Sequence, residues 1–213
     1  MRMDTLTGAR SVRKLTPGIN LLLLPYPPFL LPEQGLFNCI YIKLEVPVVV
    51  HQRSVTKVWI EVPYDYAVIA ESGESHLLVD VFPSEAGVPK LAVYGDLAEG
   101  MLCRYFKSRV DEEARRGVAR VLLNIINHNE DAASVSRVVL PRLGFNMYYS
   151  SEGSVIGSDT VMILRSPSAA EVEFEEPKLE RGMMKVPLVQ RERRLLEAIA
   201  QKIPERFLMR WGY

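Results

Sequence analysis

The sequence predicts a mainly β protein: an antiparallel β-sandwich or barrel-like fold followed by one C-terminal α-helix. Apolar and polar residues alternate along several short segments, turn-forming clusters separate these segments, and only one segment has clear helical spacing. Alternation with a period of two is what a half-buried strand needs, because successive side chains point to opposite faces. Short strands without intervening helices are typical of sandwiches and barrels.

The clearest alternation lies in residues 38–46. Ile40 and Ile42 share one face of this segment, and Tyr41 and Lys43 share the other. The same criterion, with turn residues between the segments, predicts further strands at Val55–Val62, Tyr66–Ala70, His76–Phe82, Lys90–Tyr94, Met101–Lys107 and Glu171–Glu175, and a hairpin between Phe145–Ser150 and Thr160–Arg165.

Residues 111–129 fit both a helix and a strand. Their apolar residues have helical spacing, but the polar ones also alternate, and Gly117 inside a helix would cost about 1 kcal/mol relative to alanine. We predict a turn of helix at 111–116 and a strand at 118–126, with a returning strand at Ser134–Leu140.

The C-terminal region, residues 177–213, is predicted to be a charged connector, a helix at Leu188–Lys202 and a tail. The tail alternates from Phe207 to Trp211, so it could add a final strand to the sheet. One apolar stripe runs along the helix: Leu188, Leu195, Leu196, Ile199 and Ile203. We expect this region to dock on the β domain of residues 1–176 or on a dimer partner. That β domain could itself be two packed subdomains with a boundary near 95–117.

Two cysteines, Cys39 and Cys103, are too few for a disulfide scaffold and lack zinc-site spacing. We favour two buried thiols, with a single bridge between them as the alternative.

The most apolar stretch is Ile19–Leu31, which contains Pro25, Pro27 and Pro28. A spanning helix needs about 20 apolar residues, so this stretch is too short, and its prolines remove backbone donors. We expect a soluble, cytoplasmic protein with no membrane association.

The 26 basic and 26 acidic side chains give a formal net charge of zero, which disfavours a dominant polyanion-binding role. Glycine-rich phosphate loops, dinucleotide fingerprints and nucleophile elbows are absent from the sequence. His51, His76 and His128 are far apart in sequence, without a second ligand nearby. We therefore assign no catalytic residue, metal or cofactor, and we lean against an enzyme.

The acidic row Glu171, Glu173 and Glu175 falls on one face of its strand. Paired carboxylates can bind a cation, but we favour a solvated edge that discourages pairing with another strand.

Two stretches mix basic and aromatic residues, Arg104–Arg109 and Arg206–Tyr213. Such mixtures can stack bases and neutralise phosphates, although packing explains them equally, and we consider nucleic acid an improbable partner. The candidate binding residues are Arg104, Tyr105, Lys107, His128, Arg210 and Trp211.

Several stretches resemble an archaeal family grouped as domain of unknown function 432. They are Tyr94-Gly95, Gly100–Tyr105, Val135–Pro141, Tyr148-Tyr149 and Phe207–Tyr213, mainly in the second half of the chain. The resemblance implies an archaeal origin but no activity and no functional residues. We also expect a thermophilic source.

Our first hypothesis is a non-catalytic protein that works by binding or by self-association as a homodimer. The alternative is an enzyme or a carbohydrate- or nucleotide-binding protein with its site in a cleft of the β-sandwich. A third hypothesis is a single-stranded nucleic-acid binder that uses the basic and aromatic stretches. The small-molecule ligand is unknown.

Overall fold

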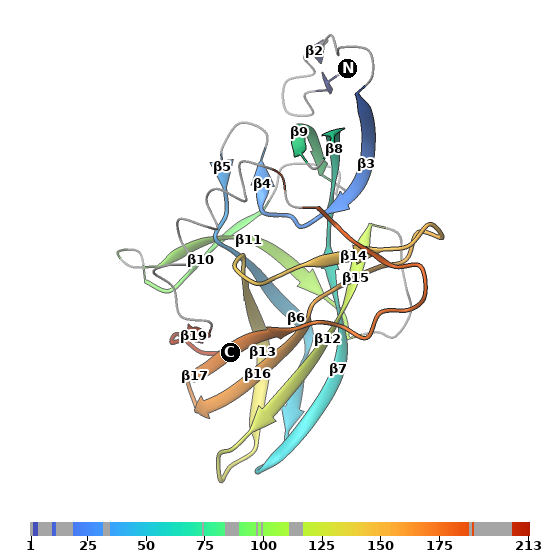
Figure 1. Cartoon of the computed structure of the whole chain (residues 1–213). Coiled ribbons are helices and arrows are strands. Elements are labelled where there is room, and N and C mark those ends of the chain that lie inside the picture. Colours follow the sequence, from blue (N-terminus) through green and yellow to red (C-terminus); the bar gives the residue numbers. More distant parts are fainter. Residues whose placement is uncertain are drawn as a thin grey trace.

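A computed structural model describes residues 2–3, 10–11, 19–31, 35–73, 75–83, 90–96, 98, 100–110, 117–187, 189 and 206–213. Within these residues all regular structure is β, so the predicted mainly β class is confirmed (Figure 1). The predicted helix at Leu188–Lys202 lies outside the described residues, apart from Val189. The predicted turn of helix at 111–116 also lies outside them. No described residue belongs to a helix, so the helical part of the predicted fold is not borne out.

The strands follow one another along the chain, and most are short. Their bounds are β1 Arg2–Met3, β2 Arg10–Ser11, β3 Asn20–Tyr26, β4 Leu30–Leu31, β5 Gly35–Leu36, β6 Cys39–Val50, β7 Ser54–Pro63, β8 Asp65–Ser72, β9 Ser75–Pro83, β10 Leu91–Tyr94, β11 Met101–Ser108, β12 Val118–Asn127, β13 Ala133–Pro141, β14 Met147–Tyr149, β15 Val155–Gly157, β16 Asp159–Ser166, β17 Ala169–Glu175, β18 Met184–Lys185 and β19 Phe207–Met209.

Two curled sheets form half-barrels that share one core (Figure 1). The small sheet has the order β10-β11-β6-β13. The large sheet has the order β18-β14-β15-β12-β16-β17-β19, with β7 also paired to β12. A three-stranded sheet, β3-β8-β9, lies beyond one end of these two sheets, and β1-β2 and β4-β5 form separate pairs.

Most strand pairs of the described residues are antiparallel, but some are parallel. β11 runs parallel to β6, and β12 runs parallel to both β15 and β16. Two strands that are adjacent in a sheet but far apart in the sequence can pair in parallel, because no short hairpin joins them.

The chain crosses between the two sheets twice at one corner, where Asn127 holds the connections together. β6 belongs to the small sheet and β7 to the large one, whereas β12 and β13 make the reverse crossing. The buried Asn127 amide donates hydrogen bonds to the carbonyl oxygens of Val50, His51 and Asp131 at 3.2, 3.1 and 2.9 Å. One buried side chain therefore satisfies backbone groups of both crossings.

Alternation along β6 places its apolar row in the core, as predicted: Ile40, Ile42 and Leu44 are buried. Val46 continues the row in sequence but is 69% exposed. The register of β6 against β13 shifts after Lys43, so the following residues bulge out of the ladder and the alternation no longer aims Val46 inward.

Residues 111–129 fit both a helix and a strand, and their described part contains the strand β12, Val118–Asn127. β13 returns beside β6 as expected. The predicted hairpin between Phe145–Ser150 and Thr160–Arg165 is wrong. β14 instead pairs with β15, and β16 pairs with β17. The tail does add a final strand, because β19 pairs with β17. β17 consequently has neighbours on both sides and is not the edge that its acidic row suggested.

Polar and aromatic contacts tie the three-stranded sheet to the rest. Arg104 on β11 forms a buried ion pair with Asp65 on β8 and donates to the Pro28 carbonyl at 3.3 Å. The rings of Phe29 and Phe145 meet edge to face at 6.0 Å. All three sheets contribute buried residues to one hydrophobic cluster. The division at 95–117 into subdomains stays a prediction.

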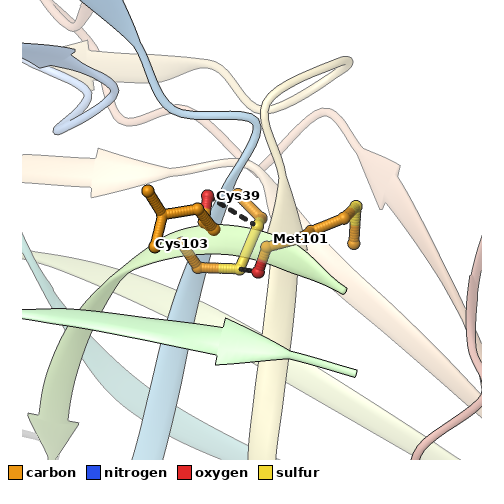
Figure 2. Close-up of a disulfide and its surroundings, with 4 residues drawn as sticks. Cys39, Met101 and Cys103 are labelled. Atoms are coloured by element: carbon orange, nitrogen blue, oxygen red, sulfur yellow. Dashed lines mark hydrogen bonds between the residues drawn. A yellow bond between two sulfur atoms is a disulfide. The ribbon is translucent and has the colours of Figure 1, made fainter. Parts of the chain in front are cut away.

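A disulfide joins Cys39 on β6 to Cys103 on β11, so the favoured interpretation of two free thiols is wrong and the alternative bridge is present (Figure 2). The two cysteines are register partners on adjacent parallel strands, with Cα atoms 4.7 Å apart, and both are buried. Their sulfurs lie 3.7 and 3.6 Å from the carbonyl oxygens of Leu102 and Met101. Bonded sulfurs carry no hydrogen, so these are close contacts rather than hydrogen bonds.

In the part of the chain that the structure describes, there is no helix of the length and apolarity that a bilayer crossing requires.

Candidate functional site

The face of the small sheet opposite Ile40 and Ile42, called its outer face, carries aromatic and cationic side chains in rows. Tyr41 and Tyr105 are register partners on β6 and β11. One step further along the same face, Lys43 pairs in register with Lys107 on one side and Arg137 on the other. Side chains two residues apart on a strand share a face, so the aromatic and cationic rows are neighbours.

A pocket of about 300 Å³ opens on this face. Strands β6, β10, β11 and β13 supply its floor, and the C-terminal tail supplies one wall. Its lining consists of Tyr41, Lys43, Ala92, Val93, Tyr94, Gly95, Tyr105, Arg137 and Trp211. Four aromatic rings and two cations therefore converge from segments that are far apart in sequence.

The aromatic rings are packed against one another. The rings of Tyr41 and Tyr105 lie 5.7 Å apart with an interplanar angle of 30°. Trp211 meets Tyr94 edge to face at 5.5 Å. Tyr41 and Tyr105 are half-buried, and Trp211 is exposed, so each presents part of its ring to solvent. Such offset contacts fix ring positions before a ligand arrives.

Hydrogen bonds hold the tail against the sheet. The Trp211 N–H donates to the Tyr94 hydroxyl at 3.2 Å, and that hydroxyl donates to the Gly212 carbonyl at 3.1 Å. Arg137 links the floor of the pocket to the tail, because it donates to the Tyr41 hydroxyl at 3.2 Å and to the Trp211 carbonyl at 3.1 Å. The side chains that hold the tail in place therefore also line the pocket.

Burial raises the pKa of Tyr94, although the Trp211 N–H and the charge of Arg137 act in the opposite direction. The phenol is therefore protonated at neutral pH and can donate to Gly212 as described.

Two glycines permit the close approach of the tail. Gly95 has φ +118°, and a Cβ there would lie 2.8 Å from the Gly100 Cα and 3.3 Å from the Trp211 ring. Gly212 has φ +82°, and its Cβ would lie 2.9 Å from Arg137 Nη2. Both backbone conformations strain an L side chain, so any larger residue would also disturb the pocket wall.

The pocket is cationic. Neither Lys43 nor Arg137 forms an ion pair with a carboxylate of the described residues, and the same is true of Lys107. The next row is neutral, because Arg109 pairs with Glu45 at 3.1 Å. Like charges placed opposite one another on a sheet are destabilising, so the row of three cations does not help the fold.

The structure separates the residues that the sequence analysis grouped as candidates. Tyr105 and Trp211 line the pocket. Lys107 lies beside it in register with Lys43, and the exposed Arg210 precedes Trp211. His128 is exposed in the turn after β12, at the corner between the sheets.

Arg104 lies on the opposite, core-facing side of β11, paired with Asp65. The geometry gives it a structural role and places it outside this pocket.

The sequence analysis missed Tyr41, Lys43, Tyr94 and Arg137. A usable signal existed for Tyr41 and Lys43, because they occupy the face opposite the apolar row of their strand. Tyr94 and Arg137 lie in stretches that carried the family resemblance, as do Tyr105 and Trp211. Nothing local in the sequence shows that these stretches meet at one site.

No group of three histidine, cysteine, aspartate or glutamate side chains able to hold a metal ion occurs among the described residues. His76 instead lies 3.6 Å from Glu71 on the neighbouring strand.

The fold and pocket define a mixed β protein with an aromatic, cationic site on the outside of one sheet. The model of the family described as "Protein of unknown function (DUF432)" matches residues 3–210, and the chain belongs to this family. The match covers nearly the whole chain rather than mainly its second half. No curated protein and no solved structure matches the chain.

Proposed function

We propose that the protein is a non-catalytic binding protein whose pocket on the small sheet takes an anionic ligand with a flat ring. The observation that carries this proposal is the convergence of four aromatic residues with Lys43 and Arg137 around one pocket. Flat rings stack on tyrosine and tryptophan, and lysine and arginine bind phosphate or carboxylate.

The charge of the lining selects among ligand classes. An aromatic cage for a cationic ligand is disfavoured, because Lys43 and Arg137 would repel it. A neutral sugar could stack on the rings but would leave both cations without a partner. Among the described residues, the lining contains no carboxylate, histidine, serine or cysteine, which supports binding over catalysis.

Fluorescence offers a direct test, because the chain has two tryptophans and Trp211 lines the pocket. In a Trp59→Phe background, adenosine 5′-monophosphate should change Trp211 emission and bind more tightly than adenosine or ribose 5-phosphate. Lys43→Ala should weaken binding roughly tenfold, as expected for the loss of one charge-assisted contact. Lys178→Ala, which removes an exposed lysine from the connector after β17, is the matched control. If none of the four common nucleoside monophosphates binds, the proposal fails.

Self-association is the second candidate, because the β10–β11 ribbon exposes Leu91 and Leu102, which lie outside the pocket lining. β10 ends the small sheet within the described residues, and an apolar edge strand favours pairing with a second chain. Sedimentation should then show a dimer that Leu102→Asp dissociates. A monomeric wild-type protein would reject it.

The expected archaeal, thermophilic and cytoplasmic setting also belongs to this proposal. Disulfides are rare in the cytosol of mesophiles, whereas intracellular proteins of hyperthermophiles carry them. A cytoplasmic location combined with the bond between Cys39 and Cys103 therefore favours a thermophilic source. Measurement of the melting temperature tests this expectation.

A further inference from the structure

We infer that the ligand of this pocket is single-stranded nucleic acid, which lies across the outer face of the small sheet with one base in the pocket. The inference rests on the proposed function and extends it from an anionic ring to a polymer. Its basis is that the cationic surface continues beyond the pocket, while the aromatic rings stay at its centre.

The rings provide a platform for stacking. Tyr41 and Tyr105 sit side by side on the two central strands, with rings tilted by 30° and each partly exposed. Trp211 closes the pocket beside them. Aromatic side chains on an open sheet face are a recurrent way to stack unpaired bases, because every base has a π face.

The cations extend over more than one phosphate. Arg137, Lys43 and Lys107 lie in register on three adjacent strands, so their row spans about 10 Å. Lys107 is exposed and lies outside the pocket lining. Lys90 is exposed opposite Tyr105, whose N–H donates to the Lys90 carbonyl at 2.8 Å. A mononucleotide in the pocket would leave Lys107 and Lys90 without an anionic partner among the residues that the structure describes.

The balanced charge of the whole chain does not oppose this assignment. On the outer face of the large sheet, arginines and glutamates neutralise one another: Arg165 lies 2.6 Å from Glu171, and Arg206 lies 2.9 Å from Glu173. The three cations of the small sheet have no such partners among the described residues. A net charge of zero therefore conceals a local basic surface.

The pocket favours a single strand over a duplex. Its walls, which include Trp211 and Gly95, enclose about 300 Å³. A base that is paired and stacked inside a duplex cannot enter such a site unless it is first flipped out, which costs a few kcal/mol. An unpaired base enters without this cost.

Competition binding to the full chain tests the assignment, with Trp211 emission of the Trp59→Phe protein as the signal. The probes are adenosine 5′-monophosphate, a four-residue oligoadenylate, and the same oligonucleotide sequence within a longer duplex. The oligonucleotide should bind at least about thirtyfold more tightly than the monophosphate. Its affinity should fall with salt with a logarithmic slope of about −2, as expected for three phosphate contacts on a single strand.

Two variants sharpen the test. Lys107→Ala should reduce the salt slope by about 0.7, whereas the matched Lys178→Ala should leave both slope and affinity unchanged. Tyr105→Ala should weaken oligonucleotide binding roughly 5- to 150-fold, the loss expected for one stacked base. Tyr149→Ala is the aromatic control, because Tyr149 lies on the large sheet.

The outcomes separate this inference from the proposed function. Equal affinity for the monophosphate and the oligonucleotide would overturn the inference and leave the proposed function intact. Equal affinity for the duplex would also overturn the inference. If neither the monophosphate nor the oligonucleotide binds, both fail.

Discussion

Arg104 and Tyr105 are neighbours in the chain, yet they belong to different parts of the molecule. β11 turns Arg104 into the core side of the small sheet, where it pairs with Asp65, and turns Tyr105 outward into the pocket. The inner face joins the small sheet to the three-stranded sheet. The outer face carries the rings and cations of the pocket.

The two faces differ in whether their charged side chains are paired. The inner face holds one guanidinium, which is buried and paired. The outer face holds Lys43, Lys107 and Arg137 side by side without a carboxylate of the described residues to pair them. Residues kept in an unfavourable electrostatic arrangement point to function, whereas satisfied ones point to stability.

The largest effect is expected on the inner face. Arg104→Ala should lower the free energy of unfolding by about 3–5 kcal/mol, because it leaves the Asp65 carboxylate buried without its cation. Urea unfolding measures the change. Arg210→Ala, which removes an exposed arginine, is the control and should change stability by less than about 0.5 kcal/mol. A similar, small effect for both variants would mean that the inner face does not depend on this pair.

Loss of the disulfide should destabilise the fold by about as much as loss of the pair between Arg104 and Asp65. Replacing Cys39 and Cys103 together by alanine should lower the free energy of unfolding by about 4 kcal/mol, because the bond closes a loop across a sequence separation of 64 residues. Differential scanning calorimetry should show a melting temperature lower by roughly 8–16 °C. Wild-type protein unfolded in the presence of a strong reductant should show the same loss, and an unchanged melting temperature in both experiments would contradict the expected contribution.

Local patterns in the sequence predicted local structure well. The alternation that buries Ile40 and Ile42 is a property of one strand, and so is the alternation that makes Phe207–Met209 a strand. The parallel pairing of β6 with β11 and the bond between Cys39 and Cys103 depend on which distant segments meet. Local periodicity carries no information on that choice.

The candidate site was predicted only in part for the same reason. Tyr105 and Trp211 stood out because basic residues flank them in the sequence. Tyr94 and Arg137 have no such neighbours, and only the hydrogen bonds from the folded tail bring them to Trp211. Arg104 lies outside the pocket, and a flanking charge does not reveal which face of the strand a residue occupies.

A smaller effect, of opposite sign, is expected on the outer face. Lys43→Glu should raise the free energy of unfolding by about 0.2–1 kcal/mol, because it places an anion between Lys107 and Arg137. The same variant should abolish binding of adenosine 5′-monophosphate. Lys57→Glu on the large sheet is the matched control and should destabilise, because Lys57 is near the Asp159 carboxylate. If Lys43→Glu destabilises as much as Lys57→Glu does, the cationic row is not an unfavourable arrangement.

The smallest effects concern the outer face of the large sheet, where charges are paired and acid should act in two opposite ways. A hydrogen bond from Arg165 lowers the pKa of Glu171, so its contribution to stability is present above the ordinary carboxyl pKa and is lost as the pH falls through the lowered value. Burial, and then the charge of Glu175, raises the pKa of Asp159. The folded state therefore prefers protonated Asp159, and the stability that it contributes is present below the ordinary aspartate pKa and is lost as the pH rises through the raised value.

Urea unfolding at a series of acidic to neutral pH values separates the two contributions. Glu171→Gln should be less stable than the wild type at neutral pH, and this difference should shrink on acidification. Asp159→Asn should be more stable than the wild type at neutral pH, with the difference again shrinking in acid. On the outer face of the small sheet, no carboxylate of the described residues pairs with Lys43, Lys107 or Arg137. Lys43→Ala should therefore shift the stability curve without changing its slope. A slope change as large as that of Glu171→Gln would show that a carboxylate does pair with the cationic row in solution, and the contrast between the two outer faces would be lost.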